Sequence, residues 1–358
     1  MSDDSIVVET TRRIFADLAD PQTLTSATDD AWKAGLWSAL EAAGLTLAWV
    51  PEAAGGAGAE MADGFDVLRI SGQYAAPAPI AETLLAALTL ARAGIALPEG
   101  AMTVGPIRDG DVLRLADGKI TGRARAVPFA AEAAHLAAMV EDASGVAHVA
   151  LIPLGEAAAT ARDADLGAAR ADLHFDGAVP AALAPAPADF GAEDFRRLGA
   201  VIRVQQMAGG LETALDLCTR YVQERVAFGK PIGKFQAVQQ NLARLAGEVA
   251  AALTAASSSA DTLARWTEGD ADITPEDLFL ECAAAKIRAG EAANEGAAIA
   301  HQAHGAIGFT NEYVLQRFTR TLFGWRDDFG GEARWALNLG NAMAARGADA
   351  LWPALTRR

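Results

Sequence analysis

The chain has 358 residues, of which 51% are hydrophobic and 21% are charged, so it has enough apolar material for a large buried core. The formal net charge of −16 argues against nucleic acid as a partner, because phosphate backbones are bound by clustered Lys and Arg side chains. The sequence shows neither a secretory signal nor the ~18 apolar residues of a membrane span, so we expect a cytoplasmic protein with no membrane span.

Residues 1–100 are predicted to form an α-helical domain. Apolar side chains recur there at helical spacing, and glycines follow several of the periodic stretches. The predicted helices cover residues 6–20, 29–44, 64–76 and 79–94. The stretch 47–61, a Gly-rich turn after a short apolar run, lies between the second and third helices and has no phosphate-binding signature, so we interpret it as a plain loop.

Residues 101–190 have a different pattern, with short β-like runs separated by Asp-Gly turns. The predicted strands cover residues 103–107, 111–115, 119–127, 135–140, 146–154 and 169–175. This spacing indicates an antiparallel sandwich or barrel. The proline-rich stretch 179–190 is predicted to lead out of this β domain.

The helical period returns in residues 191–358. One apolar face of a long helix is traced by Val238, Leu242, Leu245, Val249 and Leu253. Long helices joined by short turns form a bundle. The sequence therefore predicts a mainly α protein with a central β domain, in three parts.

A cationic segment, RVAFGKPIGKFQ at residues 225–236, interrupts this helical region. We expect Arg225, Lys230 and Lys234 to lie near the start of a new helix, where free N–H groups and the helix dipole favour a phosphate. Arg225 can grip a phosphate through two hydrogen bonds, and Phe228 offers an apolar platform for an aromatic ring. Taken alone, the pattern also fits a solvent-exposed cationic corner.

A second segment, KIRAGEAANEGAAIAHQAHGAIGFTNEY at residues 286–313, is an Ala-rich helix that ends in a Gly-rich turn. Together the two segments resemble the acyl-CoA dehydrogenase family. The family pattern R-x-x-F-G-x-P-[IL]-x-x-[FH]-Q is matched by Arg225, Phe228, Gly229, Pro231, Ile232, Phe235 and Gln236. The later pattern Q-x-x-G-[GA]-x-G-[FY]-x-x-E-Y-x-[LV] is matched by Gln302, Gly305, Ala306, Gly308, Phe309, Glu312, Tyr313 and Leu315. The stretch VPEAAGGAG also matches the family's P-E-x-x-G-G-x-G.

The resemblance implies an acyl-CoA dehydrogenase-like architecture with an N-terminal helical domain, a β-barrel or sandwich and a C-terminal four-helix bundle. It implies an FAD-dependent enzyme that converts an acyl-CoA thioester to the trans-2-enoyl-CoA and passes electrons to an electron-transfer flavoprotein. The family assembles as a dimer of dimers, with FAD lying across a subunit interface. Arg225, Phe228 and Gln236 would then reach a cofactor held mainly by a neighbouring subunit, and Gln302 and Gly305 would do the same at its pyrophosphate.

The catalytic base is where the sequence departs from the family. The family supplies a glutamate from one of two places, and these correspond here to Gly199 and Phe329, neither of which is an acid. Asp327, Asp328 and Glu332 flank the second position. We predict Glu332 as the candidate base, because it follows a flexible pair of glycines that allows the turn to shift.

A second departure concerns the flavin contacts that a subunit of this family makes to its own FAD. The corresponding stretches, TVGPIRDGD and RAVPFAAE, lack the expected Ser, Thr and Trp side chains, and leave Thr103 and Phe129 as the nearest substitutes. This asymmetry resembles the short subunits of heteromeric, steroid-type acyl-CoA dehydrogenases, which implies a role in lipid or steroid catabolism. The sequence leaves open a homo-oligomer or a hetero-oligomer with a paralogous subunit. It also leaves open a non-catalytic subunit that completes a paralogue's FAD site, and a related flavin oxidase or desulfinase-like activity.

Two other features are interpreted as structural. His301 and His304 are three residues apart, but no complementary ligands accompany them, so we expect no metal site. Cys218 and Cys282 lie in Ala-rich stretches and are expected to be buried free thiols.

Overall fold

The computed structural model describes residues 5–27, 29–162 and 168–356. The N-terminal part contains five α-helices: α1 (Ile6–Leu18), α2 (Pro21–Thr25), α3 (Trp32–Ala42), α4 (Met61–Tyr74) and α5 (Ile80–Arg92). Two short 3₁₀ turns, η1 (Leu45–Leu47) and η2 (Glu52–Ala54), connect α3 to α4. The Ser5 side chain caps α1 by accepting a hydrogen bond from the Val7 amide.

The central part is one eight-stranded sheet in the order β6-β7-β3-β2-β4-β5-β8, with β1 paired to β4. Its strands are β1 (Met102–Gly105), β2 (Leu113–Ala116), β3 (Lys119–Pro128), β4 (His135–Asp142), β5 (Ala147–Pro153), β6 (Ala158–Arg162), β7 (Arg170–Ala178) and β8 (Ala182–Pro185). A 3₁₀ turn, η3 (Leu154–Glu156), follows β5. Most pairs are antiparallel, but β4 runs parallel to both β1 and β2. The proline-rich stretch contributes β8, which pairs with β5 and was not predicted as a strand.

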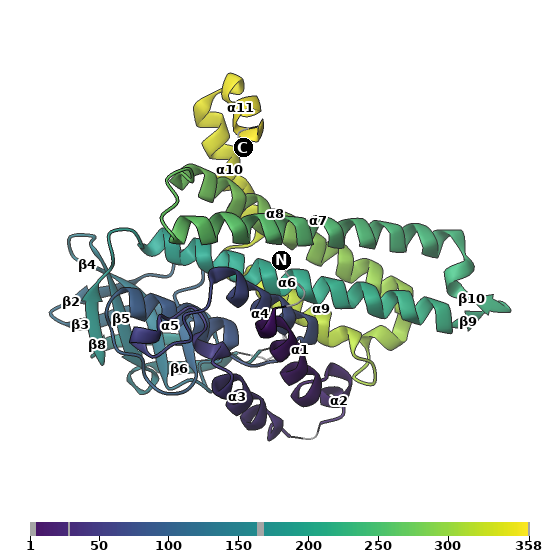
Figure 1. Ribbon diagram of the computed structural model, residues 1–358, viewed down its shortest axis with the longest axis horizontal. Coiled ribbons are helices and arrows are strands. Elements are labelled where there is room, and N and C mark those ends of the chain that lie inside the picture. Colours follow the sequence, from purple (N-terminus) through teal and green to yellow (C-terminus); the bar gives the residue numbers. More distant parts are fainter. Residues whose placement is uncertain (1–4, 28, 163–167, 357–358) are drawn as a thin grey trace.

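The C-terminal part is a bundle of four long helices: α6 (Ala192–Glu224), α7 (Gln236–Thr267), α8 (Pro275–His304) and α9 (Leu315–Asp327). Figure 1 shows α6, α7 and α8 running side by side along the longest axis, with the β sheet at one end. A two-stranded hairpin, β9 (Val226–Ala227) and β10 (Lys230–Pro231), lies at the other end, followed by η4 (Ile232–Lys234). The remaining elements are η5 (Gly305–Phe309), α10 (Glu332–Arg346), η6 (Ala348–Ala350) and α11 (Leu351–Thr356), and α11 projects away from the body (Figure 1).

The helix α6 connects the parts of the molecule, because it packs against α4 on one side and against α7, α8 and α9 on the other. Its contact with α4 is very close. A Cβ on Gly209 of α6 would lie 2.0 Å from the carbonyl oxygen of Arg69 on α4. A larger residue at this position would push the two helices apart, so the packing of the N-terminal helices on the bundle depends on it.

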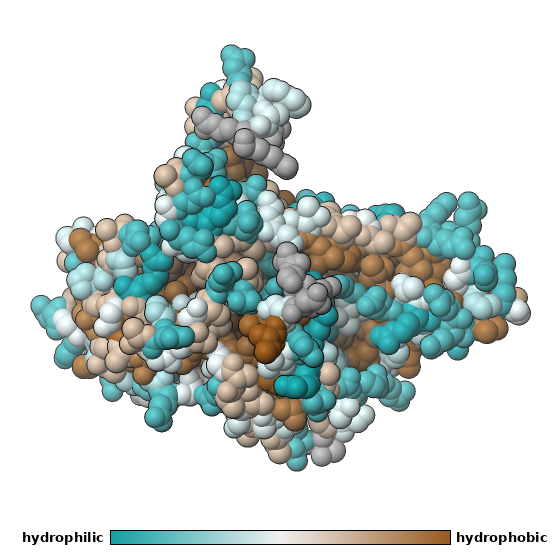
Figure 2. All heavy atoms as spheres, in the orientation of Figure 1, coloured by the Kyte–Doolittle hydropathy of each residue, from teal (hydrophilic) through white to brown (hydrophobic). Residues whose placement is uncertain are grey.

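One face of the bundle keeps apolar side chains only partly covered. Leu245 and Val249 of α7 are buried, as their helical spacing indicates, whereas Val238, Leu242 and Leu253 are half-buried. Figure 2 shows apolar side chains exposed along this side of the bundle. Within the described ranges, no helix is both long and apolar enough to cross a membrane.

Candidate functional site

The cationic segment forms a tight hairpin rather than the simple helix-to-helix corner that was expected. Phe228 and Gly229 occupy its tip with φ of 52° and 80°, the left-handed pair typical of a type I′ turn. Gly229 adopts this conformation without strain, whereas Phe228 is an uncommon residue in this region. The hairpin and η4 separate the end of α6 from Gln236, the exposed first residue of α7.

The cations of the segment are all exposed to solvent. Arg225 ends α6, and its amide donates to the Tyr221 carbonyl at 2.8 Å. Its guanidinium makes no hydrogen bond or ion pair with any residue that the structure describes. Lys230 lies over the Phe235 ring, with the ammonium 4.4 Å from the ring centroid, and Lys234 is exposed. The hairpin therefore presents uncompensated positive charge on a chain with a net charge of −16.

Exposed apolar side chains gather at the same end of the bundle. Phe228 is 95% exposed, Phe309 is 69% exposed and Val226 is 57% exposed. Such residues are usually covered in a functional assembly, since exposed apolar groups that cluster mark binding surfaces.

The second predicted segment lies at the end of α8. Gln302, in the last turn, and Gly305, just after the helix, are both exposed. Gly305 has φ of 65° and ψ of −146°, a conformation that side-chain-bearing residues rarely adopt. The left-handed glycine ends α8 and leads the chain into η5.

An aromatic cluster joins the two segments. Tyr221 of α6 stacks on His304 of α8, with ring centroids 4.4 Å apart. His304 Nε2 lies 3.2 Å from the Tyr313 hydroxyl, and its Nδ1 lies 2.8 Å from the Ala300 carbonyl. The structure therefore brings the segments containing Arg225 and Gly305 to one end of the bundle.

The two histidines contribute packing to this end. Burial lowers the pKa of both His301 and His304, which favours the neutral imidazole. His301 stacks on Phe309 at 4.1 Å between centroids and hydrogen-bonds the Thr319 hydroxyl at 2.8 Å. No group of His, Cys, Asp or Glu side chains suited to a metal ion occurs among the described residues. Cys218 and Cys282 are buried free thiols, and burial raises the pKa of each to about 12.

The two positions expected to supply a base are neighbours in space. The Phe329 ring lies directly on Gly199 of α6, and a Cβ on Gly199 would be 2.4 Å from the ring. Phe195 meets the Phe329 ring edge to face, with centroids 6.0 Å apart. An aromatic ring therefore fills the space in which a carboxylate at either position would lie.

Glu332, the predicted base, is the first residue of α10. Its carboxylate forms a bidentate ion pair with Arg326, with Arg326 Nε 2.8 and 2.9 Å from the two oxygens. The hydrogen bonds from Arg326 lower the pKa of Glu332, outweighing its partial burial. Glu332 also packs against Gly290 of α8. Its geometry is that of a carboxylate held by a guanidinium, and its role as base stays a prediction.

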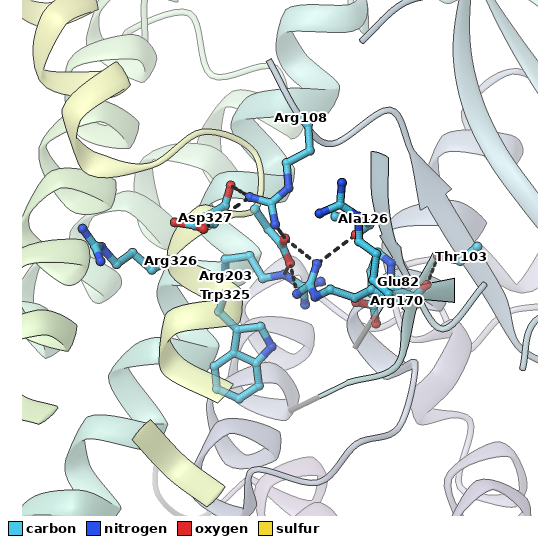
Figure 3. Close-up of polar contacts among 12 residues, drawn as sticks. Glu82, Thr103, Arg108, Ala126, Arg170, Arg203, Trp325, Arg326 and Asp327 are labelled. Atoms are coloured by element: carbon cyan, nitrogen blue, oxygen red, sulfur yellow. Dashed lines mark hydrogen bonds and ion pairs between the residues drawn. The ribbon is translucent and has the colours of Figure 1, made fainter. Parts of the chain in front are cut away.

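The turn between α9 and α10 contains a buried charge network that was not predicted from the sequence. Asp328 is fully buried and accepts hydrogen bonds from Arg170 at 2.8 and 3.0 Å and from Arg203 at 3.1 Å. Arg203 also pairs with Glu82 of α5. Figure 3 shows Arg108, Arg170 and Arg203 converging from different elements on the segment after Trp325. Arg203 and Glu82 each stand alone in a strongly apolar helical stretch, and a lone charge in such a stretch is the signal that indicates a buried pair.

Burial alone would raise the pKa of Asp328, but Arg170 and Arg203 outweigh it and hold the pKa below its usual range. Lys286 of α8 is also fully buried and donates to the Trp325 and Arg326 carbonyls at 3.1 and 2.7 Å. Burial lowers the pKa of Lys286 to about 7. The turn after α9 is therefore held by basic side chains from several elements.

The residues suggested as substitutes for the chain's own flavin contacts are not available to a ligand. The Thr103 hydroxyl is fully buried and donates to the Pro128 carbonyl at 2.6 Å. Phe129 is 5% exposed. Neither of these two side chains is therefore exposed to a ligand in this chain.

Comparison with known proteins identifies relatives of this chain. Residues 197–323 match the family described as acyl-CoA dehydrogenase, C-terminal domain. The chain is 28% identical over 326 residues to acyl-CoA dehydrogenase IpdE2 of Mycobacterium tuberculosis, covering 88% of this chain and 89% of that protein.

Solved structures share the fold over nearly the whole chain. The ChsE4–ChsE5 complex of Mycobacterium tuberculosis contains a chain with a TM-score of 0.82 and 24% identity, covering 97% of this chain and all of that one. A steroid ACAD, Tcur3481–Tcur3483, gives a TM-score of 0.78 and 23% identity over 95% of this chain and 97% of that one. These matches confirm the predicted fold class, a mainly α protein with a central β domain.

Proposed function

Because the chain belongs to the acyl-CoA dehydrogenase family, as its two motifs predicted, we propose that it is a subunit of an FAD-dependent enzyme that oxidises an acyl-CoA to the trans-2-enoyl-CoA. FAD, when bound, supplies the acceptor for the hydride that leaves Cβ. In the proposal, this chain completes the site of a cofactor held mainly by a neighbouring, paralogous subunit. One observation carries the proposal. Gly199 and the Phe329 ring occupy the two positions at which the family carries its catalytic glutamate, while the segments that contain Arg225 and Gln302 are exposed to solvent.

The exposed end of the bundle fits the diphosphate of FAD. Arg225 has a free guanidinium that can bind two phosphate oxygens, and Lys230 and Lys234 add positive charge beside it. Gln302 and the turn at Gly305 would contact the pyrophosphate from the neighbouring helix end. In contrast, the buried Thr103 hydroxyl already has a partner, so it does not offer a hydrogen bond to a flavin ring held by this chain's own β domain.

The exposed apolar side chains fit the same proposal. Phe228 would lie against a ring of the neighbour's cofactor, and Gln236 would reach the same nucleotide from the start of α7. Phe228 is almost fully exposed to solvent within its own chain, so contact with a neighbouring subunit would bury most of its phenyl ring.

A paralogous partner is proposed because one chain does not carry a whole site. Support comes from the ChsE4–ChsE5 complex, which joins two named proteins, and from the steroid ACAD named for two chains. We propose a hetero-oligomer built as a dimer of dimers, in which the half-covered face of α7 meets another bundle. The proposal implies a cytoplasmic enzyme of lipid or steroid catabolism that passes electrons to an electron-transfer flavoprotein.

The base in this proposal comes from the partner subunit. A general base for the α proton works best with a pKa raised toward neutrality, as in a desolvated pocket. The ion pair with Arg326 lowers the pKa of Glu332 instead. Glu332 stays the candidate for a base within this chain, and the ion pair counts against it.

The test is to purify the chain alone and after co-expression with a candidate paralogous subunit from the same genome, and to measure flavin absorbance and its bleaching by acyl-CoA. We expect a colourless chain alone and a yellow complex that bleaches. A chain that is yellow alone and bleaches would show a self-sufficient enzyme. A complex that forms without flavin would contradict the cofactor assignment.

A further inference from the structure

The turn formed by Asp327–Gly331, here called the closing turn, brings a phenyl ring against α6. A Cβ on Gly199 would lie 2.4 to 2.6 Å from three atoms of the Phe329 ring, so the ring and the glycine fill each other's space. Phe329 is 3% exposed, and Phe195 covers its edge. The ring is therefore a packed part of the wall between α6 and the β domain.

The backbone of the closing turn is fixed from three sides. The Phe329 amide donates to the Ile107 carbonyl at 3.0 Å, and its carbonyl accepts from Trp335 Nε1 at 3.1 Å. Phe329 has φ of 56°, an uncommon conformation for a bulky residue. Asp328, directly before it, is anchored by Arg170 and Arg203. These contacts fix the backbone that carries the ring.

The space that remains beside the ring is small. A cavity of about 110 Å³ is lined by Ile107, Arg108, Phe195, Arg196 and Phe329, among others. Sites for drug-sized ligands have volumes of roughly 300–1,000 Å³. A thioester with its acyl group does not fit in this cavity.

We infer that Phe329 closes this chain's own acyl cleft and that Asp328 is the positioning residue that holds the ring in place. The inference depends on the proposed function only for the identity of the excluded ligand, an acyl-CoA. It goes beyond that function because it gives a structural reason for this chain to lack an acyl site of its own, namely that the Phe329 ring occupies the space. Replacing the ring by a smaller side chain would open an apolar cleft next to the existing cavity.

The test uses the flavin-containing complex and a fatty acyl-CoA that carries a photoreactive diazirine on its acyl chain, with labelled residues mapped by mass spectrometry. In the wild type we expect labels on the partner and none at Ile107 or Phe195. In Phe329→Ala we expect new labels at these two residues. The matched control Phe175→Ala removes an equally buried ring from the β domain and should label as the wild type does.

A second measurement does not require activity. Cavities of about 150 Å³ left by buried apolar side chains bind benzene. We expect benzene to raise the Tm of the Phe329→Ala chain and to leave the wild type unchanged. If Phe329→Ala does not fold, Phe329→Leu removes the ring with a smaller loss of volume and is tested with both probes.

The positioning role of Asp328 is tested by Asp328→Asn, which keeps the size and removes the charge. We expect hydrogen exchange at the Phe329 amide and the Trp335 indole N–H to rise more than exchange in the β-domain core, and labels at Phe195. Unchanged exchange in the closing turn would contradict this role.

Labels at Ile107 or Phe195 in the wild type would overturn the inference, as would an absence of both new labels and benzene binding in the Phe329 variants. Failure of the proposed function is distinguishable from both outcomes. In that case neither flavin nor label is found on any chain, and the benzene measurement still decides whether the ring closes a cleft.

Discussion

Tyr221 and His304 stack with their ring centroids 4.4 Å apart and thereby connect the end of α6 to the end of α8. Arg225 follows Tyr221 by one helical turn, and Gly305 follows His304 directly. Two segments far apart in sequence therefore meet at one end of the bundle, away from the buried charge network around Asp328.

Arg225→Ala should weaken the retention of FAD by the assembled protein. A hydrogen bond to a charged group contributes about 1.5–3 kcal/mol, so we expect FAD to bind roughly 10- to 100-fold more weakly. Flavin content after dialysis of the complex measures this effect. Arg114→Ala removes an exposed guanidinium from β2 and serves as the control. Equal flavin loss in both variants would remove the assigned role of Arg225.

Glu332→Gln should leave turnover of the complex nearly intact while lowering stability. A general base contributes about 10²–10⁴-fold to a rate, so near-normal turnover would exclude Glu332 as the base. Loss of the partly exposed pair with Arg326 should cost about 1 kcal/mol in the free energy of unfolding. Steady-state kinetics and urea unfolding measure the two effects. A loss of turnover with FAD still bound would instead support Glu332 as the base.

Asp328→Asn should destabilise the chain strongly, because it leaves Arg170 and Arg203 buried with one acceptor fewer. Breaking a buried pair costs about 3–5 kcal/mol. The pKa of Asp328 is lowered in the folded chain, so its contribution is present above the unfolded value of about 3.9 and lost as the pH falls further. Circular dichroism during acid titration should show this loss in the wild type and a smaller one in the variant.

Lys286→Met should change the pH dependence of stability on the alkaline side. The pKa of Lys286 is about 7 in the folded chain against 10.5 for an ordinary lysine, so the unfolded chain binds an extra proton between these values. The stability of the wild type should therefore rise with pH across this window, by up to about 1.4 kcal/mol per pH unit. Urea unfolding from pH 7 to 10 should show this slope in the wild type and its loss in the variant. Equal slopes would contradict the lowered pKa.

Gly199→Ala and Phe329→Ala should compensate each other. The first crowds the ring and should cost about 1–3 kcal/mol, and the second leaves a cavity and should cost about 3–5 kcal/mol. The double variant should be less destabilised than the sum, because the added methyl enters the space that the ring has left. Chemical unfolding of the four proteins gives the coupling energy. Strict additivity would show that the two residues do not touch.

Much of the architecture could be predicted because its signals are local. Helical periodicity in the first and last parts and the Asp-Gly turns between them indicate the order of helices, sheet and bundle. The strand β8 could not be predicted in this way, because it is a short edge strand and the prolines at its end and in the adjoining loop are more typical of a loop. The hairpin at Phe228 was missed since its turn depends on left-handed φ values at two residues, of which only Gly229 is a typical signal.

The candidate site was predictable where residues are close in sequence. The segments at Arg225 and Gln302 could be identified from their motifs, but their meeting through Tyr221 and His304 required the structure. The network at Asp328 could not be derived from spacing, because its members come from a strand, two helices and a turn. The contact of Phe329 with Gly199 could not be predicted either, because it depends on how α9 packs along α6.

The convergence of charges on Asp328 also has a mechanical consequence. Arg170 belongs to the sheet, Arg203 to the bundle, and Glu82, the second partner of Arg203, to the N-terminal helices. Rotating any of these three parts against the others would separate opposite charges in a medium without water, at a cost of several kcal/mol. The chain therefore has no hinge at this junction. Relative rotation of the helical domain, the sheet and the bundle at this point is therefore disfavoured.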